Sequence, residues 1–288
     1  MKIVPFKIPF SESSSFRVQI DEMDHFYDKF HHHDEVQITW IQKSYGSLLM
    51  GNSITSFFEN DLLVIGANVP HCFRNDKMFY DKKAKGNAKS TCIFFNENAF
   101  GEKFFELPEL RNIHNFIKGA NRGFRIKGST KAMVLNALEK MENKNGVDRI
   151  LTLIKILDQL SRSKEMEVLS KISFLANPTS NESKRLENVF QFVVDNYNRT
   201  IQLKEAAAIT NLSISAFCRF FKQRTQKTFS QFVNEFRISI ACKKMIQDED
   251  SISETCYKVG FSNLSNFNRQ FKQITGFTPS KYISKYKD

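Results

Sequence analysis

The sequence predicts an α+β multidomain protein with an N-terminal β-barrel, a helical connector and an all-α C-terminal domain. Three observations predict this fold class. Residues 1–100 hold short β-branched runs separated by turn signals, and residues 101–176 place apolar side chains at helical spacing. The last hundred residues contain an internal repeat. With 288 residues, the chain is long enough for two domains of ordinary size.

Strands are expected at residues 36–41, 62–66 and 91–95. The first segment alternates and is rich in β-branched residues, and the other two are short apolar runs. Turn-forming pairs such as Gly51-Asn52 stand between them. Short strands at this spacing favour a sandwich or a small barrel for residues 1–100.

Helices are expected at residues 98–106, 109–118, 129–143 and 147–163. The last two are amphipathic, with apolar side chains at i, i+3 and i+4 spacing. Residues 101–176 are therefore interpreted as a helical connector. The polar, turn-rich segment 177–183 is interpreted as a linker to a C-terminal domain at 184–288.

The charge of the chain favours a polyanionic partner. The formal net charge is +11, and residues 181–288 hold 17 Lys and Arg against 10 Asp and Glu. Residues 211–233 contain four cations and no acid, and residues 257–287 contain six cations and no acid. Such stretches suit nucleic acid or an anionic membrane, although two solvated helix faces would give the same pattern.

The remaining bulk features favour a cytoplasmic protein. The five cysteines form no CxxC pair, which fits a reducing compartment. The N-terminus lacks the apolar core of a signal peptide, and no apolar run approaches the ~18 residues of a membrane span. We therefore expect no membrane partner.

The internal repeat becomes visible when residues 213–233 are laid over residues 263–283. Nine of the 21 positions are identical. Upstream of each copy the sequence predicts a short helix, then Asn211 or Gly260, which tolerate left-handed backbone geometry, and then Ser213 or Ser262 as N-cap. A second helix follows at about 214–225 or 263–275. This pattern is typical of a helix-turn-helix, so the sequence predicts two such units.

The outward face of each second helix carries the candidate DNA-binding residues. Short polar side chains come early and cations follow a turn later, which suits base edges and phosphates respectively. A capped, solvated helix start is the alternative for the polar group. The candidates are Ser215, Ala216, Arg219 and Lys222 in the first unit, and Asn263, Ser265, Asn266, Arg269 and Lys272 in the second.

A long signature joins these units. It reads Arg237-Ile238-x-x-Ala241-Cys242-x-x-Met245, Ile252-Ser253-Glu254-x-x-x-x-Val259-Gly260-Phe261, Phe267-x-x-x-Phe271-Lys272 and Gly276-Phe277-Thr278-Pro279-x-x-Tyr282. Over residues 184–287 the chain closely resembles the AraC/XylS family of transcription regulators. The resemblance implies two helix-turn-helix subdomains joined by one long helix at about 228–247. It also implies that their recognition helices enter successive major grooves, ~34 Å apart on one face of DNA.

One departure from the family concerns the first recognition helix. It has Ala216 and Cys218 where the family often has larger polar residues. We therefore expect the second unit to supply more of the sequence discrimination and the first to contribute more through phosphate contacts.

The N-terminal strands resemble the cupin-like domain that many members of this family carry. In metal-binding cupins an HxH pair, a Glu some four residues later and a distant His form the ligand set. Here His31, His33 and His71 match the histidines, but Gln37 occupies the Glu position, and Glu35 falls on the opposite strand face.

Three interpretations of these residues remain open. They are a vestigial site without metal, an effector pocket lined by His31, His33, Gln37 and His71, and a working metal site in a cupin enzyme. The sequence contains no other catalytic constellation. We expect no enzyme activity, no cofactor and no bound metal, with the effector pocket as the expected role.

The sequence is thus interpreted as a transcription regulator controlled by a small-molecule effector. Double-stranded DNA is the expected partner, with RNA polymerase and a second copy of the chain as further candidates. By resemblance, the helices at 129–163 would form the interface of a homodimer, with Leu135, Leu138, Leu153 and Leu157 at its seam; packing on the barrel is the alternative. The rival functions are a metal-dependent enzyme fused to a DNA-binding module and an effector-independent DNA binder.

Overall fold

The computed structural model describes residues 4–9, 14–51, 53–80, 87–170, 181–247 and 250–286. Contacts between Cα atoms divide the chain into two compact units, one mainly of residues 2–178 and one mainly of residues 179–288. Residues 177–180 of the expected linker lie outside the described residues, and residues 181–183 already belong to a helix.

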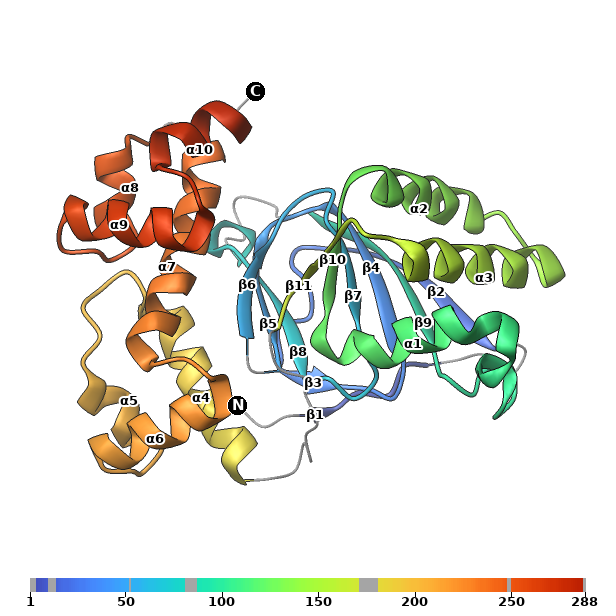
Figure 1. Ribbon diagram of the computed structural model, residues 1–288, viewed down its shortest axis with the longest axis horizontal. Coiled ribbons are helices and arrows are strands. Elements are labelled where there is room, and N and C mark those ends of the chain that lie inside the picture. The colour runs from blue at the N-terminus through green and yellow to red at the C-terminus, as the bar shows by residue number, and fades with distance from the viewer. Residues whose placement is uncertain are drawn as a thin grey trace. The chain divides into compact units, whose positions relative to one another are not determined.

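The N-terminal unit contains two β-sheets (Figure 1). Its strands are β1 (Val4–Pro5), β2 (Phe16–Met23), β3 (His31–His32), β4 (Val36–Lys43), β5 (Gly46–Met50), β6 (Ser53–Phe57), β7 (Leu62–Ile65), β8 (His71–Asn75), β9 (Ala88–Phe95), β10 (Phe124–Ile126) and β11 (Met166–Val168). The expected strands at 36–41, 62–66 and 91–95 are confirmed as β4, β7 and β9.

The described strands do not close into a barrel, so the prediction of a closed barrel was wrong. One sheet has the order β1-β3-β8-β5-β6 and the other the order β11-β10-β7-β4-β9-β2. The segment after residue 100 supplies β10 and β11, which extend the larger sheet past β7. Two three-residue strands carry too little alternation to be recognised in a sequence, which is why the wider, open sheet was missed.

Strand β4 shows how the two faces of the larger sheet are used. Val36, Ile38 and Trp40 belong to a large apolar cluster shared with the helices, whereas Gln37 and Thr39 line a cavity on the other face. Successive side chains of a strand point to opposite faces. Because both faces are covered, nearly the whole strand is buried.

Helices cover one face of the larger sheet (Figure 1). The α-helices of this unit are α1 (Arg111–Gly119), α2 (Gly128–Met141) and α3 (Gly146–Arg162). They confirm the predicted helices at 109–118, 129–143 and 147–163. The 3₁₀ helices are η1 (Lys77–Tyr80), η2 (Phe104–Glu106), η3 (Pro108–Leu110) and η4 (Ala120–Arg122). The helix predicted at 98–106 was wrong, because only turns and η2 occur there.

The apolar stripes of α2 and α3 face the core of their own unit. Leu138, Leu153 and Leu157 are 0–1% exposed, and Leu135 packs against the same cluster. The prediction that these leucines form a dimer seam was therefore wrong, and their packing against the sheet is confirmed. The exposed large apolar side chains of the two helices are Met133, Val147 and Leu151.

The C-terminal unit is helical throughout its regular structure (Figure 1). It consists of α4 (Asn181–Asn196), α5 (Leu203–Ile209), α6 (Ile214–Thr225), α7 (Phe229–Gln247), α8 (Ile252–Lys258), α9 (Leu264–Thr275) and α10 (Pro279–Tyr286). The predicted long joining helix is α7, and the predicted helix pairs are α5–α6 and α8–α9. Phenylalanines form their core, with Phe217 and Phe221 in the first pair and Phe267 and Phe271 in the second fully buried.

Candidate nucleic-acid interface and N-terminal cavity

Both helix pairs turn through a residue in left-handed conformation. Asn211 has φ of 55° after α5, and Gly260 has φ of 88° after α8. The turn at Gly260 is crowded, because a Cβ on this glycine would lie 2.2 Å from the carbonyl oxygen of Tyr197. Only glycine fits both the dihedral angle and the close backbone approach.

The second helix of each pair begins at a side-chain cap. Ser213 Oγ accepts a hydrogen bond from the backbone N–H of Ala216 at 3.3 Å, as predicted. In the second pair the cap is Asn263, whose Oδ1 accepts from the backbone N–H of Asn266 at 2.8 Å. The prediction of Ser262 as the N-cap was wrong by one residue, because Asn263 still has extended backbone and α9 begins at Leu264.

The nine candidate DNA-binding residues lie at the surface. Ala216 and Asn266 are half-buried, and the other seven, namely Ser215, Arg219, Lys222, Asn263, Ser265, Arg269 and Lys272, are exposed. Neither α6 nor α9 contains an acidic residue, so the cations are not neutralised within their own helices. Arg269 Nη2 donates to Asn266 Oδ1 at 2.9 Å, which holds the guanidinium along the helix.

Arg237 of α7 connects the two helix pairs within this unit. Its Nε donates to the carbonyl oxygen of Tyr197 at 2.8 Å, and its Nη2 donates to that of Arg199 at 2.7 Å. The guanidinium also lies 5.6 Å from the ring centroid of Phe261, in the turn of the second pair. One side chain thus joins the chain just before α5 to the turn between α8 and α9.

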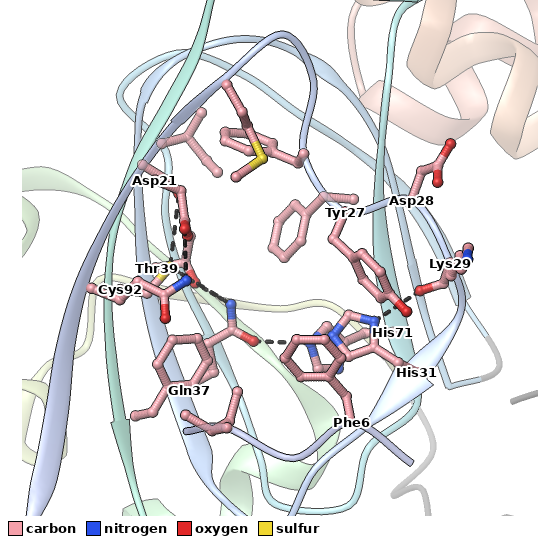
Figure 2. A pocket seen from close by; sticks show the side chains of 18 of the residues that line it. Phe6, Asp21, Tyr27, Asp28, Lys29, His31, Gln37, Thr39, His71 and Cys92 are labelled. Carbon is pink, nitrogen blue, oxygen red and sulfur yellow. Dashed lines mark hydrogen bonds between the residues drawn. The ribbon is translucent and has the colours of Figure 1, made fainter. Parts of the chain in front are cut away.

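A cavity of about 490 Å³ lies in the N-terminal unit (Figure 2). Aromatic and aliphatic side chains make up much of its wall, among them Phe6, Ile41, Phe73 and Phe94. Figure 2 shows Asp21, Thr39 and Cys92 on one side of the cavity and His31, His71 and Tyr27 on the other. The cavity is therefore mainly apolar, with polar groups gathered at two places.

The structure brings the four predicted pocket residues together. His31, Gln37 and His71 line the cavity, and His33 lies behind them, with its Nε2 atom 3.2 Å from Gln37 Oε1. All four are buried. Burial lowers the pKa of His31 to about 4 and also lowers those of His33 and His71. The three imidazoles are therefore neutral at ordinary pH.

The polar groups on the opposite wall of the cavity were not predicted from the sequence. Gln37 Nε2 donates to Thr39 Oγ1 at 2.7 Å, and Thr39 Oγ1 lies 3.4 Å from Cys92 Sγ. Burial raises the pKa of Cys92 to about 11, so the group is a thiol. Because alternate residues of a strand point to the same face, the position of Gln37 indicates that Thr39 also lines the cavity. The position of Cys92 could not be predicted in this way, because it depends on the register of β9 against β4.

The comparisons with known proteins place the chain among transcription regulators. A sequence family described as "Helix-turn-helix domain" matches residues 206–285. An uncharacterized HTH-type transcriptional regulator, YdeC of Bacillus subtilis, is 22% identical over 93% of this chain and 90% of its own. The HTH-type transcriptional activator RhaS of an Enterobacter strain is 21% identical over 86% of this chain and 85% of its own. These relatives are regulators, not enzymes.

Solved structures similar to the chain include ToxT of Vibrio cholerae, which is 15% identical with a TM-score of 0.38. The match covers 94% of this chain and 98% of ToxT. The DNA-binding domain of AdpA, solved with a target DNA, is 20% identical with a TM-score of 0.34 and covers 35% of this chain and 90% of that one. Because both TM-scores are low, these two similarities do not contribute to the assignment of a family or a function.

No helix in the described ranges of the chain is both long and apolar enough to cross a membrane. The family match covers both helix pairs from within α5 to α10, and full-length relatives carry the same kind of regulator name. The chain is an AraC/XylS-type helix-turn-helix transcriptional regulator with a C-terminal helix-turn-helix domain and a β-rich N-terminal domain.

Proposed function

We propose that this regulator binds specific DNA sequences through α6 and α9 and is controlled by a small molecule in the N-terminal cavity. The observation that carries the DNA part is the duplication: two capped recognition helices, each presenting exposed cations and no acidic residue. Two such helices separated by one helical turn of DNA, ~34 Å, would contact successive major grooves on one face.

In this proposal the exposed side chains divide by chemistry. Arg219, Lys222, Arg269 and Lys272 would neutralise phosphates, which supplies affinity and salt dependence. Ser215, Asn263, Ser265 and Asn266 would face base edges. Ala216 offers no hydrogen bond, so the first helix would discriminate sequences less than the second.

The DNA part is tested by selecting preferred sites from a random pool and titrating them against variants. Arg269→Ala and Lys272→Ala should each weaken binding to all sequences and reduce the slope of log K against log salt by about one. Lys140→Ala, which removes an exposed cation from α2, is the charge-matched control. An unchanged slope in the α9 variants would remove these residues from the interface.

The effector part rests on the cavity. Its mainly apolar wall and two polar places suit a small amphipathic molecule, with hydrogen bonds at His31, Gln37 and His71. A molecule that binds one arrangement of the N-terminal unit better than another would shift the population that is competent on DNA.

This part is tested by screening small amphipathic molecules for a rise in Tm and then measuring operator affinity with each hit. Phe73→Leu, in the cavity wall, should weaken binding of a true effector, whereas Phe116→Leu, on the helix-covered side of the sheet, should not. Equal operator affinity and equal transcription with and without every hit would contradict control through this cavity.

The proposal includes a homodimer formed through residues 129–163 and contact with RNA polymerase, both in the cytoplasm. The support for the dimer is the exposed apolar group on α2 and α3, namely Met133, Val147 and Leu151.

A further inference from the structure

A cleft of about 200 Å³ lies between the two helix pairs of the C-terminal unit. Its wall comes from the segment that precedes α5, from α7, and from the turn and first residues of the second pair. The polar side chains that line it are Thr200, Ser230, Asn234, Arg237, Ser262 and Asn266. Among the described residues of this wall, Arg237 is the only charged one and none is Asp or Glu. The cleft therefore presents hydroxyl and amide groups together with one positive charge.

The charge of Arg237 is not balanced by an acid. Its Nε and Nη2 atoms donate to the carbonyl oxygens of Tyr197 and Arg199, which are neutral acceptors. None of the salt bridges in the described part of this unit includes Arg237. Burial lowers the pKa of Arg237, but a guanidinium remains charged at ordinary pH. A half-buried cation without a counter-ion is unfavourable, and an anion in the cleft would remove that cost.

The position of the cleft indicates which anion can reach it. Ser262 directly precedes the N-cap of α9, and Asn266 lies in the first turn of that helix. Thr200 precedes α5 and Ser230 follows α6, so the facing wall belongs to the first helix pair. When the first turn of a helix enters a major groove, the sugar-phosphate backbone lies at the edge of that groove. With both pairs on DNA, the backbone between their two grooves would therefore pass this cleft.

We propose that this cleft binds one phosphate of the DNA backbone between the two major grooves, with Arg237 supplying the charge and Ser230, Asn234 and Ser262 supplying hydrogen bonds. The inference rests on the proposed function, because it needs α6 and α9 to lie in successive grooves. Arginine, serine and asparagine side chains are common partners of DNA phosphates. The volume of the cleft is below the roughly 300–1,000 Å³ of pockets for drug-sized molecules, which favours a single phosphate over a second effector.

This phosphate would have a different role from those bound by the exposed cations of α6 and α9. Arg237 bonds to the chain before α5 and contacts the ring of Phe261 in the turn of the second pair. The cleft thus has its shape only when the two pairs are packed as they are here. A phosphate held in it would fix the register of both pairs on the duplex, and it would carry no sequence information itself.

The test uses the full chain and a DNA site selected from a random pool, in which single phosphates are replaced by uncharged methylphosphonates. On wild type, replacement of one phosphate between the two grooves should weaken binding about tenfold, because hydrogen bonds to a charged group are lost. Replacement of phosphates beyond the contacted stretch should have little effect. This scan needs no variant, so it does not depend on the folding of one.

Asn234→Asp identifies the protein side of the contact. Asn234 lies three residues before Arg237 on α7, so an aspartate there can pair with the guanidinium and repel a phosphate. Binding to the unmodified site should weaken about tenfold, and the methylphosphonate that weakens wild type should have little further effect on the variant. Asn136→Asp, at an exposed position of α2, is the charge-matched control and should bind as wild type does.

Two results would overturn the proposal: no sensitive phosphate between the grooves on wild type, or an equal loss on wild type and Asn234→Asp. In both cases binding to the unmodified site persists, so the proposed function would stand. Inorganic phosphate tests the other source of such an anion. If it raises the Tm of DNA-free wild type but not of Asn234→Asp at constant ionic strength, while the scan finds no sensitive position, the cleft binds a free anion and the DNA-backbone proposal is wrong.

Discussion

At the residue scale, Asn263 combines a structural and a proposed recognition role. Its side chain caps α9 through the backbone N–H of Asn266, and it is exposed on the face proposed to meet DNA. The two roles can be separated, because serine is also a good N-cap but presents a different group to a base edge.

We therefore predict different outcomes for two substitutions. Asn263→Ser should keep the free energy of unfolding near that of wild type and change the preferred DNA sequence. Asn263→Ala should also lose about 1 kcal/mol of stability from the missing cap. Denaturant unfolding and site selection check both, and an unaltered preferred sequence in the serine variant would show that Asn263 is only a cap.

Single residues were predicted well where a local pattern determines them. The outward face of the recognition helices followed from helical spacing, and the left-handed turns at Asn211 and Gly260 followed from residue type. The cap at Asn263 was missed because Ser262 and Asn263 are both good capping residues and a one-residue shift leaves the pattern unchanged.

At the element scale, the turn between α8 and α9 depends on Gly260. Gly276 offers a matched comparison, because it also has a left-handed φ, of 81°, but an added Cβ would meet nothing within 4 Å. Gly276→Ala should cost about 1–2 kcal/mol from backbone strain alone. Gly260→Ala should cost more, because the methyl group also collides with the Tyr197 carbonyl.

Thermal and denaturant unfolding of the two variants measure this difference. Gly260→Ala should also weaken DNA binding, because the collision pushes the second helix pair away from the chain that precedes α5. Equal destabilisation by the two substitutions would show that the close approach of Gly260 to the Tyr197 carbonyl does not affect the free energy of unfolding.

The N-terminus of helix α2 is capped by a carboxylate from a distant segment of the chain. Glu165 Oε2 accepts hydrogen bonds from the backbone N–H of Thr130 at 2.9 Å and from the hydroxyls of Ser129 and Thr130 at 3.0 Å. These bonds, the one from the Thr130 N–H first, lower the pKa of Glu165 to about 2. The side chain therefore acts as the cap that Lys127 does not provide.

This cap predicts an acid-dependent stability. The pKa of Glu165 is lower in the folded state than in the unfolded state, where it is 4.5, so the ionised carboxylate stabilises the folded state. This stabilisation is complete above pH 4.5 and is lost as the pH falls toward 2. Glu165→Gln should lower Tm at pH 7, and the difference from wild type should shrink between pH 4.5 and pH 3. A difference independent of pH would mean that the charge of Glu165 does not matter.

The elements themselves were predictable where they are long and regular. Helices α3, α6 and α9 concentrate their apolar side chains on one face with clear 3.6-residue periodicity, and β4 alternates. The short strands β10 and β11 could not be found, because three residues carry no period and their pairing with β7 is a long-range event. Because β10 and β11 were not predicted, the width of the larger sheet was underestimated, and a closed barrel was predicted in place of two open sheets.

At the scale of the whole molecule, the proposed homodimer can be tested on α3. Val147 and Leu151 are 69% and 49% exposed and lie one helical turn apart. Replacing both with Glu should leave Tm nearly unchanged, because neither side chain is in the core, and should convert a dimer to a monomer. Sedimentation of wild type and variant at matched concentrations decides this, and identical masses would rule out these side chains as the interface.

The candidate site in the N-terminal unit was only half predictable. The spacing of His31, His33 and His71 suggested that they meet, and they do. The cavity beside them depends on the pairing of β2 and β4 with β9, which brings Asp21 and Cys92 to its opposite wall. No local sequence pattern predicts that strand pairing, so the shape of the cavity could not be predicted from the sequence.

The proposal that both helix pairs bind DNA together can be tested by hydroxyl-radical footprinting on a selected site. Two protected patches are expected on the same face of the duplex, about one helical turn or 34 Å apart. Arg219→Ala should weaken one patch and Arg269→Ala the other. A single patch, or two patches that both variants weaken equally, would show that the two helix pairs do not bind in this way.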